Sequence, residues 1–108
     1  MFYCYNQNNS GGWFQMDDEV AHYVIVEADS ADEANRRAQS VGIYFNGCAN
    51  EIDCDCCGDR WYEAWNDEGD AEPVIYGKPV AEHTDMFAEK GKPYAHVYYK
   101  DGRKESFV

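Results

Sequence analysis

The element that constrains the fold most is a helix predicted over residues 30–42. Ser30 and Glu33 have the spacing of a capping box, and Gly42 is the residue type that most often follows the end of a helix. Its apolar stripe consists of Ala31, Ala34, Ala38 and Val41. A stripe of this kind lets the helix backbone lie close to a sheet but buries little apolar area. Most of the core must therefore come from other segments.

Five segments with the alternation or the aromatic and β-branched content of strands supply that core. They are residues 2–7, 13–16, 22–28, 94–100 and 103–108. A polar, glycine-containing tip between the first two predicts an N-terminal hairpin, and Asp101-Gly102 between the last two predicts a C-terminal hairpin with a two-residue turn. The middle segment has the composition of a central strand.

The rest of the chain adds a short helix and a long loop. Pro79 and Gly91 bound the short helix, whereas the acidic stretch from Glu63 to Pro73 carries few structural signals. A length of 108 residues with nine Tyr, five Phe and three Trp suits one core. We therefore predict a single α+β domain over residues 1–108, in which a small antiparallel sheet of about five strands carries one main helix and one short helix.

A cysteine-rich turn between the main helix and the acidic loop is a candidate metal site. Cys54 and Cys57 have the spacing of a zinc knuckle, and the following Gly58 permits the tight turn that aims two sulfurs at one ion. A structural zinc ion needs four ligands, and the sequence holds no second pair of this kind. The other ligands would come from Cys48 and Cys56, or from the neighbouring aspartates and His22, His83 and His96.

Three interpretations of these cysteines stay open: a structural zinc clamp, reduced buried thiols, or a redox or disulfide role. The chain has five cysteines, which is an odd number, and its start lacks the basic and apolar regions of a signal peptide. No apolar run approaches the ~20 residues that cross a bilayer. These features favour reduced thiols or metal ligands over a disulfide framework, and they predict a cytoplasmic protein.

The charge of the chain is strongly negative and unevenly distributed. A formal charge of −12 repels phosphate backbones and anionic membranes, which argues against direct binding to nucleic acid or membrane. Nine acidic residues and a single basic one lie between Glu51 and Glu72, interleaved with large aromatic residues. This segment is either a docking surface for a basic protein face or a set of core aromatics with a solvated rim. Its candidate binding residues are Glu51, Asp53, Asp55, Asp59, Arg60, Trp61, Tyr62 and Trp65.

Two features are candidates for binding a small ligand. Arg60 is either a structural ion-pair hub or a fork that binds an anion. The polar tip at residues 6–12, which includes Asn8 and Asn9, offers amides and backbone donors that suit a nucleotide. It lacks the spacing of known phosphate-binding loops, and a plain turn is the other interpretation.

Several segments together resemble a family of short proteins of unassigned function that tailed bacteriophages encode. The resemblance runs along most of the chain and lies in residues 2–3, 5–12, 27–30, 33–35, 44–47, 53–54 and 56–62. It implies that the turn from Cys54 to Trp61 recurs in relatives, whereas Cys4 and Cys48 look particular to this sequence. The resemblance also implies an accessory role in an infected bacterial cell, such as host takeover or counter-defence, and it supplies no catalytic residues.

These observations predict a non-enzymatic phage accessory protein that binds and inhibits a host protein with a basic surface, such as a defence or nucleic-acid-handling factor. Carboxylates that imitate DNA phosphates are one form of this mechanism, and such binding weakens as salt rises. The alternative is a sponge for a small signalling nucleotide, with which an oligomer would be compatible. An enzyme built on a metal or a reactive thiol ranks below both.

Overall fold

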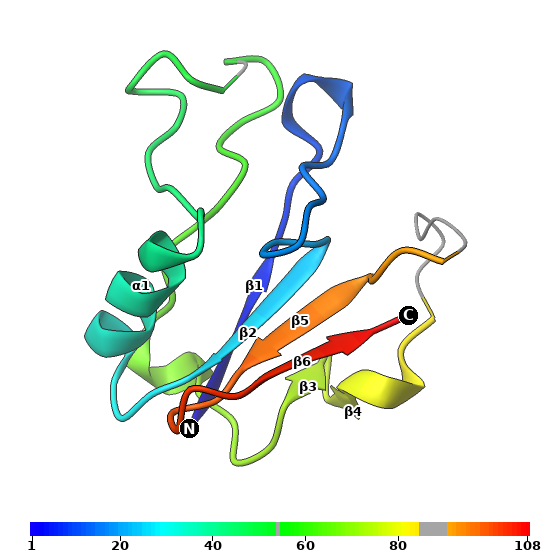
Figure 1. The fold of residues 1–108 in the computed structure, drawn as a ribbon. Coiled ribbons are helices and arrows are strands. Elements are labelled where there is room, and N and C mark those ends of the chain that lie inside the picture. Colours follow the sequence, from blue (N-terminus) through cyan, green and yellow to red (C-terminus); the bar gives the residue numbers. More distant parts are fainter. Residues whose placement is uncertain (54, 85–90) are drawn as a thin grey trace.

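The computed structural model describes residues 1–53, 55–84 and 91–108. These residues form one α-helix, three short 3-10 helices, a four-stranded sheet and a two-stranded sheet (Figure 1). The elements are β1 (Phe2–Asn6), η1 (Ser10–Gly12), β2 (Tyr23–Glu27), α1 (Ala31–Ser40), η2 (Asn66–Glu68), β3 (Val74–Ile75), β4 (Lys78–Pro79), η3 (Val80–Glu82), β5 (Ala95–Tyr98) and β6 (Lys104–Phe107). The predicted α+β class is therefore confirmed.

The main sheet is mixed, so the prediction of an antiparallel sheet of about five strands is wrong in detail. Its strand order is β1-β2-β5-β6, and β2 pairs with β5 in parallel while the two outer pairs are antiparallel. Parallel neighbours need a long crossover connection, and here the chain between β2 and β5 includes α1 and the cysteine-rich loop. The strands β3 and β4 form a separate antiparallel pair.

The predicted N-terminal hairpin is also wrong, because β1 pairs with β2 and residues 13–16 form no strand. A buried side chain takes the place of the missing ladder. The amide of Gln7 donates to the carbonyl oxygens of Gln15 and Ala21, each at 2.9 Å, and accepts from the N–H of Gln15 at 2.6 Å. The loop after β1 therefore folds back onto one glutamine and returns directly to β2.

The main helix begins and ends as predicted. Ser30 Oγ accepts a hydrogen bond from the N–H of Glu33 at 3.2 Å, and Gly42, just past the end of the helix, has a φ of +112°. Ala31, Ala34 and Ala38 are buried against the sheet. Near the last turn, the guanidinium of Arg37 donates to carbonyl oxygens of Glu27 and Tyr99, which ties the helix to the ends of β2 and β5.

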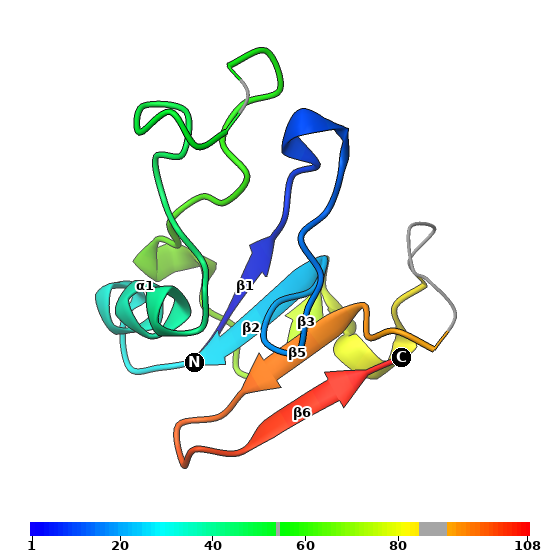
Figure 2. The same ribbon diagram turned by 45° about the horizontal axis from the view of Figure 1, so that its top comes forward.

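Both faces of the sheet are covered, which gives the molecule three layers (Figure 2). Alternate side chains of a strand point to opposite faces, so Tyr3 and Tyr5 pack with α1 while Phe2 and Cys4 pack on the side of β3. Four of the five residues of β2 are buried, as expected for the predicted central strand. The alanines of α1 let the helix lie close to the sheet, and both tyrosines of β1 are buried in the same core cluster.

The C-terminal hairpin is confirmed as β5 and β6, but its turn has three residues, 100–102, where two were predicted. The last paired residues before the turn are Tyr99 and Arg103, because the N–H of Tyr99 donates to the Arg103 carbonyl at 2.9 Å. The N–H of Gly102 donates to the Tyr99 carbonyl at 3.1 Å, and Gly102 has a φ of +93°. A glycine in this conformation is typical of three-residue hairpin loops.

The helices other than α1 are single short turns. A short helix is predicted between Pro79 and Gly91, but residues 85–90 lie outside the described residues. In the part that is described, the chain forms η3. The acidic stretch predicted as loop contains one such turn, η2. In the described part of the chain, every helix is too short or too polar to cross a membrane.

His96 on β5 is a buried titratable group and therefore links stability to pH. Its side chain is 2 % exposed, with Nδ1 at 2.8 Å from Ser106 Oγ and Nε2 at 3.3 Å from the carbonyl oxygen of Asp17. Burial lowers the pKa of His96, and nearby Lys104 acts in the same direction, whereas Asp17 and Asp18 act against them. The neutral ring is the form that the fold favours.

We predict that the free energy of unfolding falls as the pH drops from about 7.5 to about 5.5. In this window the unfolded chain takes up a proton on His96 more readily than the folded chain does, so protonation favours unfolding. Urea unfolding at both pH values measures the effect. The variant His96→Gln should show a smaller decline, and an equal decline in both proteins would contradict the prediction.

Candidate functional site

Arg60 is the centre of a buried hydrogen-bond network that joins the loop after β1 to the cysteine-rich loop. The residue is 2 % exposed, and its guanidinium carbon lies 4.1 Å from the ring centre of Trp13. Its hydrogen bonds go to Tyr44 Oη (3.1 Å), Gln7 Oε1 (3.1 Å), the Trp13 carbonyl (2.7 Å) and the Ser10 carbonyl (2.7 Å). An anion-binding fork needs donors that face solvent, so the geometry fits the structural hub.

Asp53 supplies the negative charge of this network. Its Oδ1 lies 3.8 Å from Arg60 Nε, and both side chains are at most 3 % exposed. Its Oδ2 accepts the backbone N–H of Arg60 at 2.8 Å, and its Oδ1 accepts the hydroxyl of Tyr44 at 2.6 Å. Burial and the hydrogen bond to Asp53 raise the pKa of Tyr44, which keeps this hydroxyl protonated and donating. The Asp53 side chain therefore lies inside the molecule and does not belong to its surface.

The polar tip after β1 is used to hold the cysteine-rich loop. Asn8 Nδ2 donates to the carbonyl oxygens of Cys57 at 2.7 Å and Asp59 at 3.2 Å, and the backbone N–H of Asn8 donates to the Arg60 carbonyl at 2.9 Å. Asn9 is exposed. Figure 1 shows that this tip and the cysteine-rich loop project side by side from one end of the sheet. Two candidate donor groups for a small ligand, the side chains of Asn8 and Arg60, thus already bond to other residues of the protein.

The three aromatic residues considered as anchors divide into one buried and two exposed side chains. Trp61 is 1 % exposed and belongs to the core cluster that includes the alanines of α1. Tyr62 is 59 % exposed and Trp65 is 71 % exposed. The core interpretation therefore holds for Trp61, and Tyr62 and Trp65 remain available to contact a partner.

The acidic residues of the same segment divide in a similar way. Asp53 and Asp59 face inward, and Asp59 Oδ1 accepts the backbone N–H of Cys48 at 2.9 Å. Because Arg60 is buried, the segment presents no positive side chain that offsets its exposed carboxylates. We call these carboxylates and the two exposed aromatic residues the 51–72 surface. It consists of Glu51, Asp55, Tyr62, Glu63, Trp65, Asp67, Glu68, Asp70 and Glu72.

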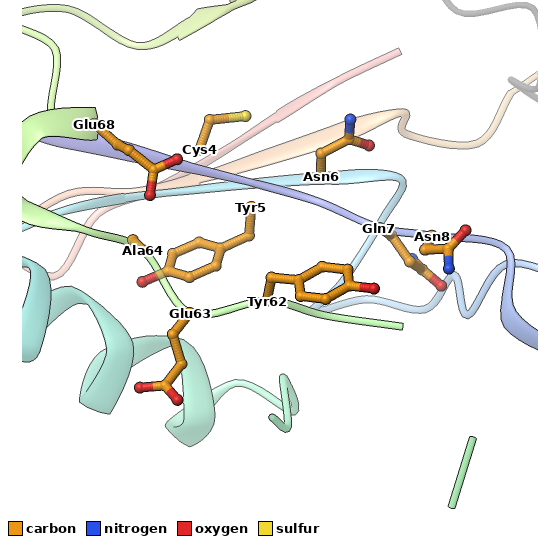
Figure 3. Close-up of a pocket in the computed structure, with 9 residues that line it drawn as sticks. All are labelled: Cys4, Tyr5, Asn6, Gln7, Asn8, Tyr62, Glu63, Ala64 and Glu68. Atoms are coloured by element: carbon orange, nitrogen blue, oxygen red, sulfur yellow. The ribbon is translucent and has the colours of Figure 1, made fainter. Parts of the chain in front are cut away.

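A pocket of about 400 Å³ lies where this segment runs beside β1 (Figure 3). Glu63, Glu68 and Tyr62 line it from the segment, and Cys4 and Asn6 line it from β1. Its volume lies within the range of ligand-binding pockets. This pocket could not be predicted, because nothing in the local sequence pattern of residues 62–68 indicates how far the segment lies from β1.

The cysteines that the structure describes are free thiols. Cys56 and Cys57 are exposed, with their sulfurs 3.7 Å apart, and Cys48 is half-buried. Desolvation, together with the carboxylate of Asp59, raises the pKa of Cys48 to about 11, and burial raises the pKa of Cys4 to about 12. Cys48 and Cys4 are therefore held as protonated thiols, which are poor nucleophiles.

The predicted zinc site stays a prediction, because Cys54 lies outside the described residues. Over residues 1–53, 55–84 and 91–108, no three histidine, cysteine or carboxylate side chains are grouped to hold a metal ion. We expect native mass spectrometry of protein purified without added metal to show one bound zinc ion. The variant Cys57→Ser should lose the ion, whereas Cys4→Ala should keep it. A wild-type chain that carries no metal would contradict the prediction.

Taken together, the fold and this geometry define a small α+β protein whose cysteine-rich loop is held by a buried arginine and whose adjoining segment exposes carboxylates and aromatic rings. The profile of one family, described as Domain of unknown function (DUF7296), matches residues 1–108, and the chain belongs to this family. No curated protein and no solved structure matches the chain.

Proposed function

We propose that this protein is a non-enzymatic binding protein that blocks a partner with a basic face through the 51–72 surface. The observation that carries the proposal is the separation of charge within residues 51–72. Seven carboxylates and two large aromatic side chains of this segment are exposed, while its only basic residue is buried. Exposed carboxylates steer a basic partner toward the surface, and Tyr62 and Trp65 provide anchors of the kind that dominate protein interfaces.

The biological setting is part of the proposal. A protein of this kind, encoded by a bacteriophage and present in the cytoplasm of an infected cell, would inhibit a host defence or nucleic-acid-handling protein. Proteins that handle DNA bind it through basic surfaces, and clustered carboxylates compete for the same surface by imitating phosphates. The nucleotide sponge is the weaker alternative, because the Asn8 amide and the Arg60 guanidinium already bond to the protein itself.

Affinity capture from a bacterial lysate with matched baits tests this function. The first bait is the wild-type chain, the second carries Glu63→Gln and Glu68→Gln, and the third carries Asp18→Asn and Glu82→Gln. All four carboxylates are exposed, so the two variants remove the same charge from different places. We expect a basic protein that the first and third baits capture at low salt, and that the second bait and high salt release. Equal capture by all three baits would contradict the proposal.

A further inference from the structure

The outer edge of β1 is open in the middle and closed at both ends. Met1 and Ala28 exchange two backbone hydrogen bonds, and the N–H of Gln7 donates to the carbonyl of His22. The backbone N–H and C=O groups of the odd-numbered residues from 1 to 7 therefore point toward β2. Backbone groups alternate in direction along an antiparallel strand, so the N–H and C=O groups of the even-numbered residues point away from β2. These residues are Phe2, Cys4 and Asn6 of β1 and Asn8 just after it.

Only the first and last of these four residues form backbone hydrogen bonds with the segment of residues 60–70 that runs alongside β1. Phe2 and Asp70 exchange hydrogen bonds of 2.7 and 2.9 Å, and the N–H of Asn8 donates to the Arg60 carbonyl at 2.9 Å. Between these two points, the backbone N–H and C=O groups of Cys4 and Asn6 make no hydrogen bond to any residue that the structure describes. These four backbone groups belong to residues that line the pocket shown in Figure 3.

The neighbouring segment lies away from β1 because the main helix holds it. The side chain of Asn35 on α1 accepts the N–H of Ala64 at 2.8 Å and donates to its carbonyl at 3.2 Å. Asn66 Oδ1 accepts the N–H of Ala31, the first residue of the helix, at 2.9 Å. Backbone groups of the segment that would otherwise be free to pair with β1 are therefore bound to α1, and the gap is built into the fold.

The gap is also negative. Glu63 and Glu68 line it, and no lysine or arginine is among the described residues that do so. Glu68 is fixed at the rim, because its carboxylate accepts the N–H of Trp65 at 2.7 Å. The pKa of the nearby Tyr5 hydroxyl is raised by burial and then by the charges of Glu68 and Glu63. Such surroundings favour a positively charged occupant.

We propose that this gap is a slot for a short, basic, extended segment of the partner protein, which adds to the edge of β1 as an extra strand. Exposed strand edges recognise extended peptides in this way, with backbone bonds to the edge and side-chain contacts around it. Because the slot is closed at Phe2 and at Asn8, it takes a stretch of about five residues, such as a chain end or the tip of a loop. The inference rests on the proposed function and names where and how the partner binds.

A titration of the labelled protein by nuclear magnetic resonance tests the slot. The probe is the capped peptide Lys-Thr-Lys-Val-Lys, and its control is Glu-Thr-Glu-Val-Glu. We expect the lysine peptide alone to shift the amide signals of Cys4 and Asn6 and to slow their hydrogen exchange. Shifts confined to other residues, equal binding of the control, or no binding of the lysine peptide at millimolar concentration would overturn the proposal.

A matched pair of variants separates the slot from the wider surface. Asn6→Pro and Asn6→Ala both remove the amide that donates to the Tyr76 hydroxyl, but only the proline removes the outward N–H. Asn6→Pro should weaken binding of the lysine peptide and of the captured partner about tenfold more than Asn6→Ala. Equal affinity of the two variants for the partner, with capture still lost in the Glu63→Gln, Glu68→Gln bait, would overturn the slot and leave the proposed function standing.

Discussion

Replacement of Arg60 by alanine is expected to lower the free energy of unfolding by about 3–5 kcal/mol. The substitution leaves the buried carboxylate of Asp53 without its countercharge. It also removes the donors from Gln7 Oε1 and from two carbonyl oxygens of the loop after β1. Buried acceptors that lose their donors are unfavourable. Urea unfolding of the variant and the wild type measures the difference.

The variant Arg103→Ala is the matched control for this prediction. Arg103 also pairs with an aspartate, Asp101, at 2.7 Å, and also lies over an aromatic ring, that of Tyr99. Both charged side chains are more than half exposed, so we expect no measurable change in stability. Arg60→Lys should lose most of the same stability as Arg60→Ala, because one ammonium cannot reach four acceptors. A loss below about 1 kcal/mol in Arg60→Ala would contradict the role of the arginine as a hub.

The double variant Tyr62→Ala, Trp65→Ala is expected to weaken binding of the captured partner by about 30- to 100-fold. Both rings are exposed, and the backbone beside them is anchored by Trp61 in the core and by the bonds of Ala64, the residue before Trp65, to Asn35. Large aromatic side chains of this kind are frequent energetic centres of interfaces. Biolayer interferometry with the purified partner measures the affinity.

Folding should be unaffected by this double variant, because the side chains that it removes are 59 % and 71 % exposed. Val108→Ala removes apolar area from a residue that is 75 % exposed and lies on the far hairpin, and it should leave the affinity unchanged. A loss of less than about threefold in the double variant would show that Tyr62 and Trp65 are not anchors.

Features of the fold that depend on neighbouring residues in the sequence could be predicted. The helix followed from Ser30, Glu33 and Gly42, whose effects reach only across one turn. The C-terminal hairpin followed from alternation around Asp101-Gly102, although the turn has one residue more than predicted. In each case the interactions that decide the structure lie within a few residues of each other.

Features that depend on a single long-range side chain could not be predicted. Gln7 replaces a strand ladder with bonds from its own amide, so the prediction of a hairpin turn at the polar tip after β1 is wrong. Asn35 on the helix binds the backbone of Ala64, 29 residues away, and so opens the pocket beside β1. Neither interaction leaves a periodic pattern in the sequence.

The candidate site shows the same division. The concentration of acidic residues between Glu51 and Glu72 is visible in the sequence, and the structure confirms that most of them are exposed. The sequence could not tell that Trp61 faces the core while Tyr62 and Trp65 face solvent, because all three lie in a segment without regular alternation. The choice between the two interpretations of Arg60 likewise required the positions of its acceptors.

Site-specific photo-crosslinking in bacterial cells tests the central claim most directly. A photoreactive phenylalanine analogue replaces Trp65 in one protein and Val108 in another, two positions with similar exposure on different parts of the fold. If the partner binds at the 51–72 surface, the protein labelled at position 65 gives a crosslinked product that contains a basic protein. The protein labelled at position 108 gives no such product. The same products from both positions, or none from position 65, would contradict this claim.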